Sequence, residues 1–185
     1  MDVGVLAVRY AKALLDYALG EGVAEEVYSR MNVLGDCFAA NPALSSTLED
    51  PLLSRQEKLN LLSVASGDGK VKEVLENFFS LVIERRRENY LRSAALSYID
   101  LYRKEKGIAV VRITTAVPLE KEMEEKILAK VSGMLGKRIE LLKSVDPAIE
   151  GGFIFDIDDY RMDASVAAQL RRIRRSLLDK NRRIV

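Results

Sequence analysis

The stretch of sequence that decides the fold occupies residues 151–175 and reads GGFIFDIDDYRMDASVAAQLRRIRR. An apolar run after the glycine pair is typical of a strand, and two adjacent aspartates are typical of a tight turn. An Asp-Ala-Ser group ahead of a periodic apolar pattern is typical of a helix start. The stretch therefore predicts a strand at Phe153–Ile157, a turn at Asp158-Asp159 and a short returning strand at Tyr160–Met162. A capped helix is expected to follow, from Asp163 or Ser165 to about Lys180.

The second half of the chain begins upstream of this stretch, where the sequence pattern changes at Gly107. The β-branched run Ile108–Val117 predicts a strand, and Arg138–Val145 alternates well enough for a second one. Between them, Glu120–Leu135 predicts a helix with one apolar face, formed by Met123, Ile127, Val131 and Leu135. Residues 107–185 are therefore expected to form a small β-α-β-β-α domain, with Gly107 as a hinge.

The first half of the chain has the pattern of helices separated by short breaks. Ser54 and Glu57 are spaced as a capping box, which marks one helix start. The six expected helices run over about Val5–Leu19, Val23–Ala40, Ala43–Leu48, Ser54–Ala65, Val71–Arg86 and Asn89–Lys106. Short loops favour an antiparallel arrangement. The expected fold class is thus mainly α with an α+β second part, in which a six-helix bundle over residues 1–106 precedes the β-α-β-β-α domain.

Composition argues against an enzyme and against a direct tie to a membrane. The 185 residues include no histidine, which is the commonest general base and metal ligand, and no glycine-rich phosphate loop with a lysine. The single Cys37 fits a reducing compartment. No apolar run is long enough for a membrane span and no signal-peptide pattern opens the chain, so we expect no membrane insertion. We also expect no catalytic residue, no cofactor and no metal.

The first helix has more apolar surface than an outer helix of a bundle needs. Its polar residues Arg9, Lys12 and Asp16 fall in one stripe about 60° wide, and the rest of the circumference is apolar. Two interpretations remain open. The helix lies at the centre of its own bundle, or one of its faces receives an amphipathic helix from another protein.

The fifth helix is the candidate for the opposite wall of such a groove. Its apolar residues cover nearly half of its circumference, and Phe78 and Phe79 point about 100° apart. Either both rings belong to the core, or one belongs to the core and one to the groove. The basic triplet Arg85–Arg87 follows at the helix end, where cations stabilise the helix dipole or are simply solvated.

The final helix combines an apolar stripe with a strongly basic outer face. Val166, Leu170, Ile173 and Leu177 are spaced to form one stripe, which is expected to lie on the sheet. Several arginines fall outside it. They could contact an acidic protein partner or nucleic acid, or only solvent.

Two stretches carry a resemblance to a known family. Arg9–Ala18 reads RYAKALLDYA and is similar to the opening helix of the delta subunit of bacterial F-type ATP synthases, the relative of the mitochondrial oligomycin-sensitivity-conferring protein. Val145–Val166, followed by Leu170, resembles that family's signature of a Gly-Gly pair, a hydrophobic strand, a tight turn and an Asp-x-Ser helix start. Asp158 and Ala164 stand where the family often has glycine, which affects only the turn geometry.

The resemblance implies a non-catalytic subunit of the peripheral stalk, or stator, at the cytoplasmic face of the membrane. The bundle in residues 1–106 would bind the N-terminal helix of an alpha subunit, and residues 107–185 would contact the C-terminal end of the b-subunit stalk. The subunit would thereby hold the catalytic head still during proton-driven ATP synthesis, without binding nucleic acid. The groove for the alpha-subunit helix is expected to involve Ala7, Tyr10, Ala11, Leu14, Val74, Phe78, Phe79 and Val82. The residues expected to contact the stalk are Arg171, Arg174 and Arg175.

Overall fold

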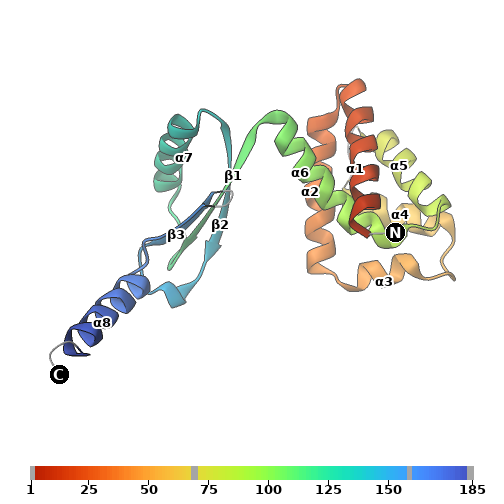
Figure 1. Cartoon of the computed structure of the whole chain (residues 1–185). Helices are drawn as coiled ribbons and strands as arrows, with labels where there is room; N and C mark the ends of the chain where they lie inside the picture. Colours follow the sequence, from red (N-terminus) through yellow and green to blue (C-terminus); the bar gives the residue numbers. More distant parts are fainter. Residues whose placement is uncertain (1–2, 68–70, 158–159, 183–185) are drawn as a thin grey trace. The chain divides into compact units, whose positions relative to one another are not determined.

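The structure is a computed structural model that describes residues 3–67, 71–157 and 160–182. The chain divides into two compact units, Met1–Lys106 and Gly107–Val185, which are described separately. It is mainly helical and contains a small four-stranded mixed sheet, in agreement with the predicted combination of α and α+β parts (Figure 1).

The first unit consists of helices joined by short connections (Figure 1). Helix α6 packs against both α1 and α2, and α4 packs against α5. The predicted fifth helix is shorter than expected, and a 3-10 turn precedes the sixth. The helices are α1 (Val3–Gly20), α2 (Ala24–Ala40), α3 (Ala43–Glu49), α4 (Arg55–Ser66), α5 (Lys72–Glu84), the 3-10 helix η1 (Glu88–Tyr90) and α6 (Leu91–Lys106).

The core of the first unit combines small and large apolar side chains. Ala11 and Ala18 of α1 are fully buried and let α6 approach closely, whereas Phe79 fills space between helices. The hydroxyl of the buried Tyr98 donates a hydrogen bond of 3.1 Å to the carbonyl of Ala24, which ties α6 to the start of α2. Burial raises the pKa of Tyr98 well above its ordinary value, so the hydroxyl stays protonated as a donor.

The predicted capping box at the start of α4 is present. The Glu57 amide donates to the Ser54 hydroxyl oxygen at 3.3 Å, and the Ser54 amide donates to the Glu57 carboxylate at 2.8 Å. Hydrogen bonds from Ser54 also lower the pKa of the Glu57 carboxyl group. The sequence pattern therefore identified this helix start correctly.

The second unit is built on a sheet of strand order β2-β1-β3-β4. The strands β1 and β2 are parallel and joined by the crossover helix α7, and the other neighbours are antiparallel. The elements are β1 (Ile108–Thr115), α7 (Lys121–Leu135), β2 (Arg138–Val145), the 3-10 helix η2 (Pro147–Ile149), β3 (Phe153–Ile157), β4 (Tyr160–Asp163) and α8 (Val166–Arg182).

The predicted β-α-β-β-α order is wrong by one strand. The segment Tyr160–Asp163 pairs with four of the five residues of β3, from Ile157 opposite Tyr160 to Ile154 opposite Asp163, so the order is β-α-β-β-β-α. The expected returning segment is thus a full member of the sheet. The turn predicted at Asp158-Asp159 lies outside the described residues.

The core of the second unit lies between the sheet and α7. Val111, Ile113 and Phe155 are buried, and Ile127 and Val131 of α7 pack against them. These two residues belong to the predicted apolar face of α7, but Met123 on the same face is about half exposed at 51%. The side chain of Leu135 lies outside the described residues.

The glycine pair before β3 has a steric explanation. Gly152 adopts a φ of +74°, and a Cβ atom there would collide with the backbone carbonyl oxygen of Ala164. The carbonyl of Gly151 accepts a hydrogen bond of 3.0 Å from the Val166 amide at the start of α8. The close approach of the two backbone segments therefore requires a residue without a side chain.

Candidate partner-binding surfaces

A shallow apolar groove of about 220 Å³ lies between α1 and α5 in the first unit. Four residues from each helix line it, and each set follows the three- and four-residue steps that place side chains on one helix face. The lining residues are Tyr10, Ala13, Leu14 and Tyr17 of α1 and Val74, Asn77, Phe78 and Leu81 of α5. Because its walls are almost entirely hydrocarbon and aromatic, the groove suits the apolar face of another helix.

The structure divides the eight predicted groove residues into two groups. Tyr10, Leu14, Val74 and Phe78 line the groove. The other four have almost no exposed surface and belong to the core: Ala7, Ala11, Phe79 and Val82. The prediction missed four lining residues, which are Ala13, Tyr17, Asn77 and Leu81. They lie three or seven residues from the predicted ones on the same helix face, so extending this spacing along α1 and α5 would have found them.

The two adjacent phenylalanines of α5 have different positions. Phe79 is completely buried, whereas Phe78 lines the groove and retains 8% of its surface. Their ring centroids are 5.8 Å apart with a tilt of 57°. Phe79 therefore supports from inside the unit the ring that forms the groove wall, which agrees with the interpretation of one core ring and one groove ring.

Arg87 fixes one end of the groove. Its guanidinium donates a hydrogen bond of 3.0 Å to the Tyr10 hydroxyl and lies 5.8 Å from the centroid of the Tyr10 ring. This residue follows the end of α5, whereas Tyr10 lies on α1, so the contact joins the two walls. Hydrogen bonding and the cation–π contact together hold the aromatic ring in place.

The second unit has a larger apolar hollow, of about 520 Å³, between α7 and the β3–β4 side of the sheet. Met134 is 78% exposed and Tyr160 83% exposed, and both line it. Lys130 and Arg161 supply the charged part of the lining. The other lining residues are Ile127, Val131, Phe153, Phe155, Ile157 and Met162.

Helix α8 exposes the apolar stripe that was predicted to lie on the sheet. Val166, Leu170 and Ile173 keep between 40% and 55% of their surface exposed, so the prediction that the sheet covers the stripe is wrong for these residues. The helix contacts η2 and continues past the sheet (Figure 1). The side chain of Leu177 lies outside the described residues.

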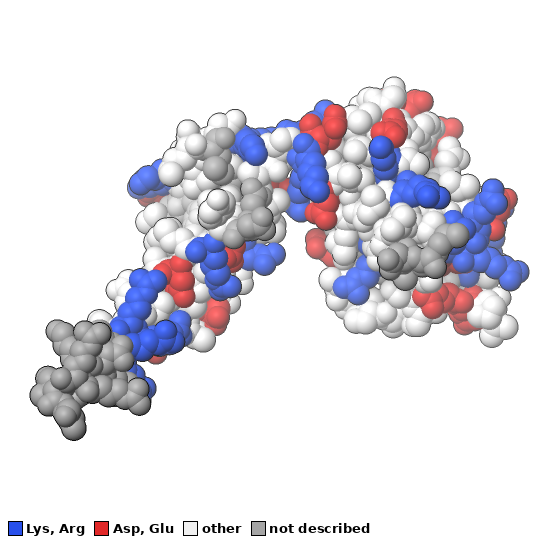
Figure 2. Space-filling model, viewed as in Figure 1, with Lys and Arg blue, Asp and Glu red and all other residues white. Residues whose placement is uncertain are grey.

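The three arginines predicted to contact the stalk are all exposed on α8. Arg171 approaches Asp163 at 3.8 Å, and its own side chain is 65% exposed, so this long pair adds little stability. Figure 2 shows Lys and Arg side chains gathered on α8. The described part of α8 therefore presents Arg171, Arg174 and Arg175 beside an exposed apolar stripe.

The start of α8 is held by Ser165 and Asp163 together. The Ala168 amide donates to the Ser165 hydroxyl oxygen at 3.1 Å, so Ser165 is the N-cap residue. The Ser165 hydroxyl and amide donate to the Asp163 carboxylate at 2.6 and 3.0 Å. These hydrogen bonds lower the pKa of the Asp163 carboxyl group. The aspartate of the Asp-Ala-Ser motif thus orients the residue that caps the helix.

The described part of the chain contains no candidate membrane span and no candidate metal-binding cluster. None of its helices combines the length and apolar character needed to cross a membrane. Within residues 3–67, 71–157 and 160–182, no cluster of three or more cysteine or carboxylate side chains could hold a metal ion.

Comparisons with known proteins identify the family. The family model described as ATP synthase delta (OSCP) subunit matches residues 6–177. A Bacteroides thetaiotaomicron protein named ATP synthase subunit delta is 46% identical to this chain, and the match covers 100% of both chains. A Flavobacterium johnsoniae protein of the same name is 37% identical over 92% of this chain and 96% of its own length. The chain belongs to the ATP synthase delta (OSCP) subunit family.

A solved structure has the same fold as this family member. A chain of the Toxoplasma gondii mitochondrial ATP synthase hexamer matches with a TM-score of 0.64 and 24% identity, covering 94% of this chain and 97% of the other. The predicted family and the predicted role as a peripheral-stalk subunit of F-type ATP synthase are confirmed. The delta (OSCP) subunit is a non-catalytic part of this membrane-associated complex.

Proposed function

We propose that the groove between α1 and α5 holds the N-terminal helix of an ATP synthase alpha subunit. The observation that carries this proposal is the groove itself, whose walls are apolar, preformed and braced from inside by Phe79 and across its end by Arg87. In this proposal, helices α1 to α6 act as one bundle that presents the groove. The amphipathic helix would gain affinity through burial of apolar surface, at about 25 cal/mol per Å², less the costs of association.

The second unit, in the same proposal, binds the C-terminal end of the b-subunit stalk. Support comes from the exposed stripe of Val166, Leu170 and Ile173 on α8, because an apolar stripe that its own sheet does not cover is suited to a partner helix. Arg171, Arg174 and Arg175 would pair with acidic side chains at the edge of that contact, which favours rapid and specific association.

With both contacts made, the subunit would join the catalytic head to the stalk without a catalytic site, cofactor or metal of its own. It would lie at the cytoplasmic face of the membrane and resist rotation of the head. Gly107, with a φ of +60°, connects α6 to β1 and would serve as a hinge. Replacing Gly107 by Pro should reduce the coupling of proton flow to ATP synthesis, and unchanged coupling would argue against the hinge.

The test of the groove proposal is binding of a synthetic helix, with the N-terminal sequence of the alpha subunit, to the full chain. Titration calorimetry should detect saturable binding at micromolar concentrations. A folded chain that shows no binding in this range, with its helical content verified by circular dichroism, would refute the proposal.

The stalk contact is tested separately by replacing Arg171, Arg174 and Arg175 together by Gln. This change should weaken binding of the C-terminal segment of the b-subunit stalk and reduce the salt dependence of that binding.

A further inference from the structure

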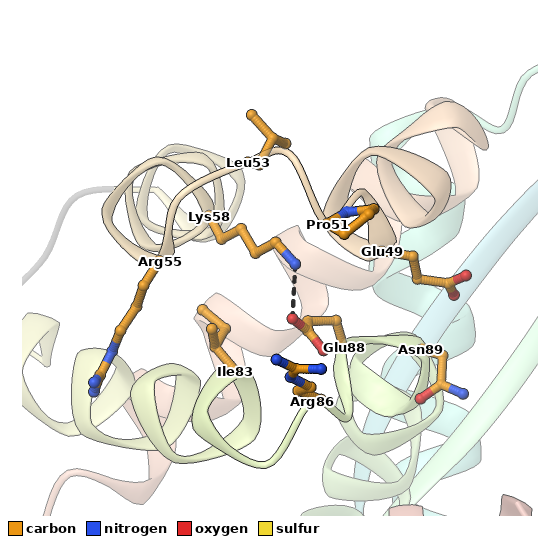
Figure 3. A pocket seen from close by; sticks show the side chains of 9 residues that line it. All are labelled: Glu49, Pro51, Leu53, Arg55, Lys58, Ile83, Arg86, Glu88 and Asn89. Atoms are coloured by element: carbon orange, nitrogen blue, oxygen red, sulfur yellow. Dashed lines mark hydrogen bonds and ion pairs between the residues drawn. The ribbon is translucent and has the colours of Figure 1, made fainter.

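A polar pocket of about 610 Å³ lies on the side of α5 that faces α4, away from the α1 groove. It is formed by the end of α3, the connection to α4, the first turn of α4, the end of α5 and η1 (Figure 3). Three cationic side chains and two carboxylates line it, together with three apolar residues and an amide. The lining residues are Glu49, Pro51, Leu53, Arg55, Lys58, Ile83, Arg86, Glu88 and Asn89.

The ion pair at the base of this pocket is satisfied internally. The Lys58 ammonium donates to the Glu88 carboxylate at 2.8 Å, and each side chain is only 9% exposed. Figure 3 shows Lys58 extending from α4 to meet Glu88. Removing one member would leave the other charge buried and unpaired, so this pair stabilises the pocket and its charges largely cancel.

Arg86 occupies a backbone position that would suit glycine. The Arg86 amide donates to the carbonyl of Ile83 and the Arg87 amide to the carbonyl of Val82, which is the Schellman arrangement at the end of α5. Arg86 is the left-handed residue of this motif, with a φ of +53°. A side chain in this conformation costs backbone energy that glycine avoids. Strain of this kind is a reason to look for a function of the side chain.

The guanidinium of Arg86 is the cation of this pocket that is available for a ligand. It makes no ion pair within the described part of the chain, whereas Arg55 contacts Ser80 and lies 3.8 Å from the Glu84 carboxylate. With the Lys58–Glu88 pair neutral and Arg55 beside Glu84, Arg86 is the lining cation without an ion-pair partner among the described residues. One unpaired guanidinium matches one carboxylate, and the lining carboxylate of Glu49 disfavours a polyphosphate because it would repel multiple negative charges.

We propose that this pocket receives a carboxylate side chain from an acidic segment of the ATP synthase catalytic head, distinct from the helix in the groove. This inference rests on the proposed attachment of the first unit to the head. Arg86 would bind the carboxylate through paired N–H donors, and Pro51, Leu53 and Ile83 would contact the neighbouring apolar part of the segment. The head would then be held on both sides of α5.

The variant Arg86→Gly tests this proposal, because glycine removes the guanidinium and also relieves the left-handed strain. The matched control is Arg85→Ala. Arg85 is the exposed neighbour with an ordinary φ of −85°, and it does not line the pocket, so both variants lose one positive charge. The probe is the catalytic head of ATP synthase depleted of its delta subunit, and its affinity for each full-length variant is measured at several salt concentrations.

We expect R86G to unfold no earlier than the wild-type chain on heating and to bind the depleted head roughly tenfold more weakly, with a reduced salt dependence. R85A should stay within about twofold of wild type. Binding of the isolated alpha-subunit helix should be the same for all three chains. Equal affinities of R86G and R85A for the head would overturn the pocket inference. Failure of the wild-type chain to bind the isolated helix would instead overturn the groove proposal, and the head titration would still decide about the pocket.

Discussion

The groove proposal makes a quantitative prediction at Leu81. This side chain lines the groove and is 44% exposed in the free chain. Complete burial of a leucine contributes about 1.5–3 kcal/mol, so covering the remaining exposed part contributes about 0.7–1.3 kcal/mol. Replacement of Leu81 by Ala should therefore weaken binding of the alpha-subunit helix about three- to ninefold. The assay is calorimetric titration of the full chain with the synthetic helix.

Leu96 provides the control for this experiment. It lies on α6, is 48% exposed and does not line the groove, so Leu96→Ala removes the same atoms at a similar exposure in the same unit. Both variants should lose a similar, small amount of stability, but only L81A should lose affinity. The reasoning fails if L96A weakens binding as much as L81A does, or if L81A binds as tightly as the wild-type chain.

Two further predictions concern the second unit. Gly152→Ala should destabilise the second unit by at least about 2 kcal/mol, since φ is +74° and the added Cβ meets a backbone oxygen. Gly133→Ala lies in an open helical position of α7 and should stabilise the same unit by about 0.5–1 kcal/mol. Urea unfolding followed by circular dichroism measures both changes. Because the pKa of Asp163 is lowered in the folded state from its ordinary value of 3.8, the carboxylate adds stability above that pH and loses the contribution as the pH falls through the lowered pKa. Asp163→Asn should therefore be less stable than wild type near neutral pH and lose that difference below about pH 3.8, and a constant difference across the acid range would contradict the assigned role.

Local patterns in the sequence predicted most elements of this fold. The Ser54–Glu57 spacing identified a helix start because both hydrogen bonds of a capping box are made within one turn. The returning strand was predicted at Tyr160–Met162 but left out of the β-α-β-β-α order, because a short run of residues does not specify by itself how far it pairs with β3. Asp163 and Ser165 both accept hydrogen bonds at the helix start, so spacing alone did not separate the cap from the residue that orients it.

Burial was harder to predict than secondary structure. Helix α1 is apolar around most of its circumference, so its sequence does not say which apolar side chains face the core and which face the groove. Ala7 and Ala11 accordingly belong to the core, whereas Ala13 lines the groove. On α8 the same ambiguity produced an error, because an apolar stripe that stays exposed has the same period as one that packs on the protein's own sheet.

The exposed stripe of α8 and the groove of the first unit would, as proposed, serve the same purpose, which is to hold the catalytic head against rotation. In the proposed assembly the groove contact would be of moderate affinity, since the groove is shallow, at about 220 Å³, and a residue such as Leu81 would add about 1 kcal/mol. A subunit bound to the head through one unit and to the stalk through the other is nevertheless hard to release. When one contact opens, the second keeps the free surfaces at high effective concentration, and rebinding precedes escape. The two proposed interfaces would thus let each partner assemble reversibly while the complete joint resists the torque on the head.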